Sequence, residues 1–320
     1  MPAAPHKKVA GGMPVLDAGL PSTMYLWMSV LPAPMHDRLL RMLRNCKERL
    51  GEAPALGTAC SGTDLIAKVV KVWDIILEEH GLKFGFVSQF ATEMDEKKQA
   101  WICHHHPELR SLFGLCSDLA RNMATCLKAG QRVVVPYVDV FVAGFSCKSR
   151  SSLNKNRKKF LNCIQEQTPC ATTDTFEDIW GYIASARPNV VVLENVKNLT
   201  DAHGADQSDA EYIVDRFRTH GWWAHIFIMH ADEFGSVARR ERMYILAVLM
   251  RPGVVITPDN VSIEVFAQHL LMAMSKGGTL KDLGDFIKRN ENSVSVMTQP
   301  PAKRFCSTPQ KKTKKKKEQK

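Results

Sequence analysis

The sequence predicts an α/β fold with a mainly parallel, doubly wound sheet and helices on both faces. Apolar stretches of strand character alternate six times with segments whose apolar residues recur at helical spacing. This alternation is typical of a parallel sheet built from strand–helix–strand units. Several of the expected strands end at polar or reactive side chains, and an open α/β sheet binds its ligands beyond the carboxyl ends of its strands. The 320 residues are enough to bury the core of such a domain.

The expected elements follow from apolar periodicity and from the residues that begin or end helices. The strands are predicted at residues 53–59, 85–91, 112–116, 138–143, 190–193, 222–229 and 243–249. The helices are predicted at residues 35–50, 65–80, 95–105, 119–128, 173–186 and 209–220, with two more at 262–275 and 280–288. Asp95 is expected to cap the helix at 95–105, because a short acidic side chain accepts hydrogen bonds from free N–H groups of the first turn.

Composition divides the chain into five predicted regions. They are a flexible arm at 1–23, a helical segment at 24–52, the α/β domain at 53–250, a small helical region at 251–290 and a disordered basic tail at 291–320. Residues 301–320 carry a net +8 of the total +10, so the pI of 9.2 is mostly a property of the tail. Such a tail predicts a nuclear-localisation segment or a nucleic-acid-binding arm, and a merely solubilising tail is the alternative.

The composition also excludes several classes of protein. No apolar run approaches the roughly 20 residues that cross a bilayer, and the N-terminus lacks the apolar core of a secretory signal. Nine cysteines without any CxxC pair argue against a disulfide framework and a common zinc site, and they favour a reducing compartment. His104, His105 and His106 would point in different directions on a helix, so a solvated helix end is predicted there and no metal site.

The stretch from Val138 to Ser152 is the centre of the predicted site. Gly144 breaks its apolar run, and Cys147 then stands at the carboxyl end of a central strand. Six lysines and arginines follow before the next acidic residue, Glu166, and nearby cations favour the reactive thiolate form of cysteine. The alternative is an unreactive, half-buried cysteine in a basic loop, since most free cysteines only pack.

Three further strand ends carry groups that suit a nucleoside. Gly62 lies in the turn after the first strand, where a missing side chain lets the backbone approach a ligand. Glu93 ends the second strand, the position from which a carboxylate can accept hydrogen bonds from ribose hydroxyls. Asp118 ends the third strand and could accept from an adenine amino group. Together they predict a nucleoside-containing cofactor, and the alternative is an ordinary polar turn with two helix-capping acids.

A second pair of segments supplies a carboxylate and two guanidinium groups. Glu194 follows the apolar run at 190–193 and is expected to be partly removed from water, which suits an acid or a hydrogen-bond donor. Arg240 and Arg242 lead into the strand at 243–249 and, as alternate residues, would share one face. Arginine forks bind carbonyl, carboxylate or phosphate oxygens. The alternatives are an acid bonded to local amides and a solvated charge cluster.

The motifs GFSC (144–147), LENV (193–196) and RRERMYI (239–245) stand in this order, each beside an apolar strand. They resemble the cytosine-C5 methyltransferase family, which has a Pro-Cys loop, an ENV motif and a QxRxR motif in that order and uses S-adenosylmethionine as methyl donor. The resemblance covers about residues 53–250 and implies a Rossmann-like methyltransferase fold. It implies a cofactor site made of Cys60, Ser61, Gly62, Thr63, Glu93, Met94, Asp118 and Leu119, with Glu93 on the ribose and Asp118 on the adenine.

The resemblance also implies a mechanism and a substrate. The thiolate of Cys147 would attack C6 of a cytosine in DNA, and Glu194 would hold the ring at N3 and the exocyclic amine. Arg240 and Arg242 would bind the O2 side. The base must leave the duplex to be reached, so the basic loop would close over it and contact phosphates. The implied nucleic-acid contacts are Lys148, Arg150, Ser151, Lys155, Arg157, Lys158 and Lys159, and a nuclear DNA (cytosine-5-)-methyltransferase is therefore predicted.

The sequence departs from the family pattern in ways that keep alternatives open. Ser146 replaces the proline before the nucleophile, Phe145 replaces another common proline, and Ala238 replaces the glutamine. About 70 residues follow Leu249, with a reduced target-recognition region and without the closing motif. The alternatives are an RNA cytosine methyltransferase and a catalytically inactive methyltransferase-fold module that binds nucleic acid. Redox or acyl-transfer use of Cys147 is the least favoured hypothesis, because no His lies near it in the sequence.

Overall fold

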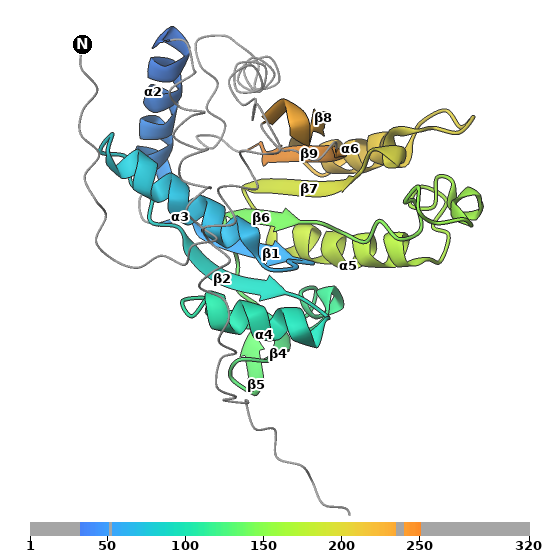
Figure 1. Cartoon of the computed structure of the whole chain (residues 1–320), viewed down its shortest axis with the longest axis horizontal. Coiled ribbons are helices and arrows are strands. Elements are labelled where there is room, and N and C mark those ends of the chain that lie inside the picture. The colour runs from blue at the N-terminus through green and yellow to red at the C-terminus, as the bar shows by residue number, and fades with distance from the viewer. Residues whose placement is uncertain (1–32, 51–52, 235–239, 251–320) are drawn as a thin grey trace, which may run out of the picture. The chain divides into compact units, whose positions relative to one another are not determined.

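A computed structural model describes residues 33–50, 53–234 and 240–250 of the chain (Figure 1). The predicted arm at 1–23, the helices at 262–275 and 280–288 and the basic tail lie outside the described residues. Ala238 and Arg239 lie outside them as well.

Seven strands form one sheet in the order β3-β2-β1-β6-β7-β9-β8. Their bounds are β1 Ala55–Ala59, β2 Val87–Thr92, β3 Ser111–Phe113, β6 Val140–Ala143, β7 Val190–Val196, β8 Trp222–His230 and β9 Glu241–Leu249. Neighbours from β3 to β7 are parallel, whereas β9 is antiparallel to both β7 and β8. The prediction of a mainly parallel sheet is confirmed. Because the strand order reverses between β1 and β6, a ligand crevice is expected beyond the carboxyl ends of these two strands.

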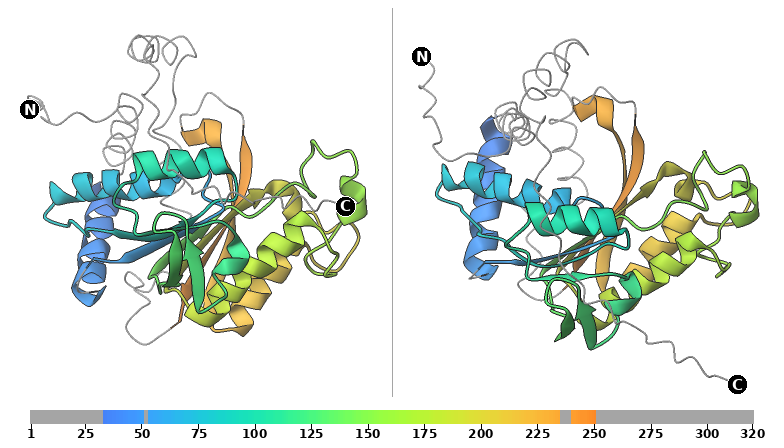
Figure 2. Two further views of the ribbon diagram at one scale, coloured as in Figure 1. Left: turned by 90° about the horizontal axis from the view of Figure 1, so that it is seen from below. Right: turned by 60° about the horizontal axis from the view of Figure 1, so that its bottom comes forward.

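Helices connect the strands and lie on both faces of the sheet. They are α2 Ala33–Leu50, α3 Leu65–Glu78, α4 Glu96–His105, α5 Ala171–Ala186 and α6 Asp209–Thr219, with short 3₁₀ turns η2 Cys116–Asp118, η3 Arg157–Phe160, η4 Lys197–Thr200 and η5 Ala231–Phe234. Figure 2 shows α3 and α4 on one face and α5 and α6 on the other. Asp95 caps α4 as predicted, since its carboxylate accepts the N–H groups of Lys97 and Lys98. None of the described helices is both long and apolar enough to cross a membrane.

The largest part of the core lies between the sheet and the helices α5 and α6. Phe176 and Ile183 of α5 and Phe217 of α6 are fully buried, in one cluster with Val191 and Leu193 of β7. Val191 and Leu193 alternate with partly exposed neighbours along β7, as expected where one face of a strand packs against helices. Burial of each such side chain stabilises the fold by about 1.5–3 kcal/mol.

The helix predicted at 119–128 is wrong, because a β-hairpin occupies part of this range. Strand β4 (Met123–Cys126) pairs antiparallel with β5 (Gln131–Val134). Leu119, Met123 and Leu127 recur every four residues, which suggested a helix, but Met123 and Leu127 are exposed. The buried residues of β4 are Ala124 and Cys126, whose alternation is that of a strand.

Strand β7 extends three residues beyond the predicted end at Leu193. The ladder between β7 and β9 continues through Val196, which pairs with Arg242. Glu194 and Asn195 therefore lie inside the strand and not in the loop after it. This placement fixes the direction of both side chains, because successive residues of a strand point to opposite faces of the sheet.

Candidate active site

The predicted site residues gather at the carboxyl end of the parallel strands. Cys60 follows β1, Glu93 follows β2, Cys147 follows β6 and Glu194 lies near the end of β7. Strands β1 and β6 are the two neighbours at which the strand order reverses (Figure 1). The cofactor turn and the cysteine loop therefore leave the sheet side by side, and one ligand crevice can serve both.

The loop after β6 holds Cys147 in a tight turn. The carbonyl of Cys147 accepts backbone N–H groups from Arg150 at 3.1 Å and Ser151 at 2.8 Å. Ser149 is buried, and its N–H donates to the hydroxyl of Thr172 in the first turn of α5 at 3.3 Å. The Cys147 side chain is half-buried. The thiol thus stands on a loop that is tied both to itself and to α5.

Two residues before Cys147, the loop is fixed by a contact that the sequence analysis did not assign to the site. Asn195 is buried, and its amide donates to the carbonyl of Phe145 at 3.0 Å. The ring of Phe145 is itself buried, 5.5 Å from the ring of Phe176. These contacts restrain a segment in which family members have proline. The asparagine of the ENV motif was the available indication of this role.

Glu194 lies between the cysteine loop and two arginines. Its Oε1 is 2.9 Å from Nε of Arg242 and 3.8 Å from Nη2 of Arg240. Its Oε2 lies on the other side, 3.3 Å from where a Cβ on Gly144 would stand. The prediction that Arg240 and Arg242 share a face is confirmed by this common partner. Hydrogen-bond donors and acceptors thus converge beside the loop that carries Cys147, as recognition of a planar polar ring requires.

The turn after β1 has an unusual backbone. Cys60, Gly62 and Asp64 all have positive φ, at 52°, 60° and 53°. The hydroxyl of Thr58 contacts the hydroxyl of Ser61 at 2.7 Å and donates to the carboxylate of Asp64 at 2.8 Å. At Gly62, no atom lies within 4 Å of the position that a Cβ would take. The turn is thus held open at Gly62, where the backbone can approach a ligand.

Glu93 supports this turn from the end of β2. Its carboxylate is buried, and it accepts the N–H of Gly62 at 2.8 Å through Oε2 and the N–H of Asp95 at 2.9 Å through Oε1. Each carboxylate oxygen has two acceptor positions. The two hydrogen bonds occupy one position on each oxygen.

The other predicted cofactor residues differ in their exposure. The side chain of Met94 is exposed, that of Asp118 is partly exposed in η2, and Thr63 is exposed beside Gly62. Asp118 forms an ion pair with Arg121 at 3.6 Å. The side chain of Leu119 is instead buried in the core, so this residue can offer a ligand only its backbone.

Arg150 does not belong to the exposed nucleic-acid contacts, and its prediction as one is wrong. Its side chain is 2% exposed. One guanidinium nitrogen donates to the carbonyl of Asn198 at 2.5 Å and contacts Nε2 of His203 at 2.9 Å, and another donates to the carbonyl of Phe160 at 3.4 Å. Arg150 therefore joins the cysteine loop to the segment after β7. Its charge in the sequence gave no indication that it would turn inward.

The remaining cations of the loop face solvent. The exposed residues are Lys148, Lys155, Arg157, Lys158 and Lys159, whereas Ser151 is half-buried. Among these, Arg157 donates to the carbonyl of Ser152 at 2.7 Å. Five positive side chains on one loop next to Cys147 form a surface that suits phosphate groups.

The sequence predicted that the histidine run is a solvated helix end, and this is only partly true: His104 is exposed and His105 is half-buried. His106 is fully buried after α4, with Nε2 3.2 Å from the carbonyl of Thr63 in the cofactor turn. Burial holds the pKa of His106 below its usual value. Within the described part of the chain, no group of three or more His, Cys, Asp and Glu side chains is arranged to hold a metal ion.

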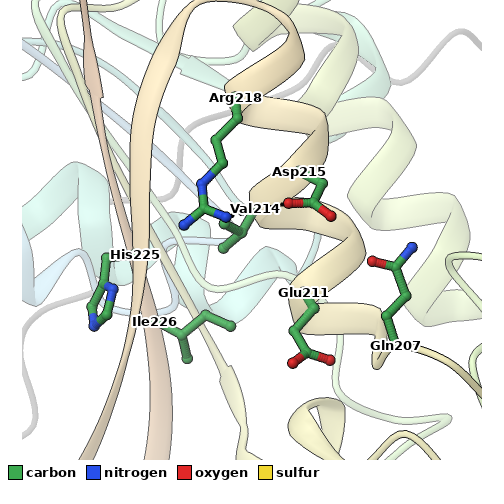
Figure 3. A pocket seen from close by; sticks show the side chains of 7 residues that line it. All are labelled: Gln207, Glu211, Val214, Asp215, Arg218, His225 and Ile226. Atoms are coloured by element: carbon green, nitrogen blue, oxygen red, sulfur yellow. Dashed lines mark hydrogen bonds and ion pairs between the residues drawn. The ribbon is translucent and has the colours of Figure 1, made fainter.

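A surface hollow lies away from these strand ends, between α6 and β8 (Figure 3). Its volume is about 380 Å³, and its lining residues are Gln207, Glu211, Val214, Asp215, Arg218, His225 and Ile226. Arg218 and Asp215 form an ion pair with each other at 3.3 Å. None of the predicted catalytic or cofactor residues lines this hollow, so we assign the site to the strand ends.

The sheet has seven strands, and antiparallel β9 lies between β7 and β8. The family model of the C-5 cytosine-specific DNA methylases matches residues 78–318. The chain therefore belongs to the C-5 cytosine-specific DNA methylase family, whose members use S-adenosylmethionine. The family resemblance inferred from the three motifs is confirmed.

Individual relatives are distant and match in part. The DNA (cytosine-5-)-methyltransferase DMT5 of Cryptococcus neoformans is 29% identical over 67% of this chain, which spans 8% of that protein. The type II methyltransferase M.Bsp6I of a Bacillus species is 32% identical over 35% of this chain and 33% of its own length. The crystal structure of the Schizosaccharomyces pombe Dnmt2 methyltransferase aligns with a TM-score of 0.40 at 16% identity, over 68% of this chain and 54% of that one. The chain thus matches only a fraction of the length of these two curated relatives.

Proposed function

We propose that this chain transfers a methyl group from S-adenosylmethionine to C5 of cytosine in DNA, through a covalent bond between Cys147 and C6 of a flipped base. The observation that carries the proposal is the convergence of two strand ends. The loop with Cys147 starts at Gly144, and the carboxylate of Glu194 lies against Gly144 while Arg242 binds its other oxygen. This contact supports a nucleophile that acts beside a ring-binding cluster, as nucleophilic catalysis on a base requires.

The residues at the neighbouring strand ends fit a nucleoside cofactor. The open position at Gly62 lets the backbone approach the ligand, and Glu93 keeps acceptor positions for the ribose. Asp118 in η2 and the exposed side chain of Met94, just after β2, are the further proposed cofactor contacts. S-adenosylmethionine, when bound, supplies the methyl group at its positively charged sulfur.

The chain's own residues then perform the remaining steps. The Cys147 thiolate adds to C6, which places electron density on C5 and makes that carbon a nucleophile. Glu194 binds N3 and the exocyclic amine, and Arg240 with Arg242 binds the O2 side, so charge that develops on the ring is stabilised. After methyl transfer, loss of the C5 proton to solvent lets the Cys147–C6 bond break. The thiolate is returned.

The proposed substrate is DNA, whose phosphate backbone must be bound while the base is flipped out of the duplex. The exposure of five cations on the cysteine loop supports contacts to phosphates beside the extruded nucleotide. The same surface suits RNA phosphates, and a cytosine in RNA is the competing substrate. The basic tail supports a nuclear location as a further proposal, which a fluorescent fusion with and without residues 301–320 tests.

Methyl transfer to paired substrates tests the proposal. The protein is incubated with S-adenosylmethionine and either duplex DNA or RNA of mixed sequence, and the nucleosides are then quantified by mass spectrometry. We expect 5-methyldeoxycytidine from DNA, and we expect it to disappear in Glu194→Gln while cofactor binding by calorimetry persists. Methylated cytidine from RNA alone would assign the RNA activity. No product from either, by folded protein that binds the cofactor, would indicate an inactive binding module.

A further inference from the structure

Two cysteines meet beside the cofactor turn, although 56 residues separate them in the sequence. The Sγ atoms of Cys60 and Cys116 are 3.3 Å apart. Cys60 follows β1 and Cys116 begins η2, after β3, so the two thiols come from strands that β2 separates in the sheet. Thr92, the last residue of β2, lies between them. Its hydroxyl accepts the N–H of Cys60 at 3.1 Å and contacts Sγ of Cys116 at 3.4 Å.

The surroundings make the two thiols unequal. The hydrogen bond between the two thiols lowers the pKa of Cys116 below the usual cysteine value. The same bond, together with burial, raises the pKa of Cys60. Both side chains keep partial contact with solvent. Cys116 is thus the better nucleophile of the pair, and Cys60 stands next to it with a proton to release.

We propose that Cys60 and Cys116 are a reversible redox site, in which exchange with a low-molecular-weight disulfide links the two sulfurs and closes the cofactor turn. In the first step, the Cys116 thiol loses its proton to solvent, and its thiolate attacks one sulfur of the small disulfide and releases the other as a thiolate, which takes up a proton. In the second step, Cys60 loses its proton and attacks the Cys116 sulfur, and the second small thiol leaves. The small disulfide gains two electrons and two protons, and the protein pair loses them.

The cross-link is expected to act on the cofactor because of where Cys60 lies. This inference rests on the proposed function, which places S-adenosylmethionine in the turn. The sulfurs must approach from 3.3 Å to a bond of about 2.05 Å, across the end of β2. Cys60 is two residues from Gly62, whose N–H is held by Glu93. A turn with three positive φ angles has little freedom to follow this movement without shifting Gly62.

Reciprocity gives the proposal a second consequence. If the cross-link weakens cofactor binding by some factor, bound cofactor must disfavour the cross-link by the same factor. Saturating S-adenosylmethionine is therefore expected to protect the pair from oxidation. A pair that was simply buried core would not respond to the cofactor.

The test uses the full chain and oxidised glutathione as the small disulfide. After native incubation and alkylation, peptide mapping should find a Cys60–Cys116 cross-link, with the loss of two hydrogen atoms, that dithiothreitol reverses. The cross-link should be absent in Cys116→Ser and Cys60→Ser and should persist in Cys103→Ser, which removes an exposed thiol elsewhere. A Cys147→Ala background excludes effects of oxidation at the proposed nucleophile.

Calorimetry on the reduced, oxidised and re-reduced protein gives the functional result. We expect oxidation to weaken S-adenosylmethionine binding at least about tenfold, within the usual range of coupling between two sites, and reduction to restore it. Stable glutathione adducts without a cross-link, or a cross-link that leaves affinity unchanged, would overturn the proposal. If the reduced protein binds no cofactor, the proposed function fails and the link to the cofactor fails with it. Peptide mapping still decides whether the cross-link forms.

Discussion

Asp64 provides a quantitative test of the cofactor turn. Asp64 is 2% exposed, and its backbone is in the left-handed region. Its carboxylate accepts a hydrogen bond from the hydroxyl of Thr58. Burial raises the pKa of Asp64 to about 6 from the ordinary value of 3.8. We predict that Asp64→Asn stabilises the protein at neutral pH, because the amide keeps the acceptor for Thr58 and carries no charge. Asparagine also tolerates the left-handed conformation.

The magnitude and sign follow from the pKa difference. A raised carboxyl pKa means that the folded state binds the proton more tightly, so the stabilising contribution is complete below 3.8 and is lost as the pH rises through about 6. About two pKa units at 1.36 kcal/mol each give a loss of about 3 kcal/mol. The free energy of unfolding of Asp64→Asn should therefore exceed that of the parent by less than about 1 kcal/mol at about pH 4 and by about 3 kcal/mol at about pH 8.

Urea unfolding followed by tryptophan fluorescence across this pH range measures the difference. Asp95→Asn is the matched control, because the backbone N–H of Lys98 holds the pKa of exposed Asp95 below its usual value. A lowered pKa contributes stability above the ordinary value and loses it as the pH falls. Asp95→Asn should therefore show no gain at high pH. A gain for Asp64→Asn that is equal at all pH values, or a loss at about pH 8, would refute the reasoning.

Four further predictions concern the cysteine loop. Asn195→Ala removes the hydrogen bond to the carbonyl of Phe145 in the loop. It should lower kcat about tenfold to a hundredfold while cofactor affinity stays within about twofold. Equal losses in kcat and in cofactor affinity would contradict this role of Asn195. Arg150→Met should lower the free energy of unfolding by about 2–4 kcal/mol, because buried carbonyls lose their donors, whereas exposed Lys158→Ala should stay within about 0.5 kcal/mol. In DNA binding, Lys158→Ala should instead reduce the salt slope by about 1. Gly144→Ala places a Cβ 3.3 Å from Oε2 of Glu194, so methyl transfer should fall more than cofactor binding, and a stability loss without that difference would oppose the assignment.

The sequence allowed the sheet to be predicted because its strands are short apolar runs that helices separate. The runs at 138–143 and 190–193 correspond to β6 and β7, and the motif residues after them lie at the strand ends. The prediction of a helix at 119–128 was wrong. The four-residue spacing of Leu119, Met123 and Leu127 is typical of a helix, but it can also occur by chance in a sequence that forms a hairpin. Only tertiary packing, which buries Ala124 and Cys126, decides between them.

The contacts in the site that were not predicted join residues far apart in the sequence. Arg150 and Asn195 bond to groups 48 and 50 residues away, and Cys60 meets Cys116 across 56 residues. Periodicity and spacing report only local geometry, so they cannot show which polar side chain turns inward to meet a distant carbonyl or thiol. His106 was predicted at a solvated helix end for the same reason, since its partner, Thr63, lies on another segment.

Covalent trapping tests the central claim, that Cys147 is the nucleophile, most directly. The protein is incubated with S-adenosylmethionine and duplex DNA containing 5-fluorocytosine, in which fluorine at C5 blocks the final elimination. We expect a denaturation-resistant protein–DNA adduct that maps to Cys147, is absent in Cys147→Ala and persists in Cys103→Ser. An adduct that survives in Cys147→Ala, or no adduct from folded protein that binds the cofactor, would contradict the assignment.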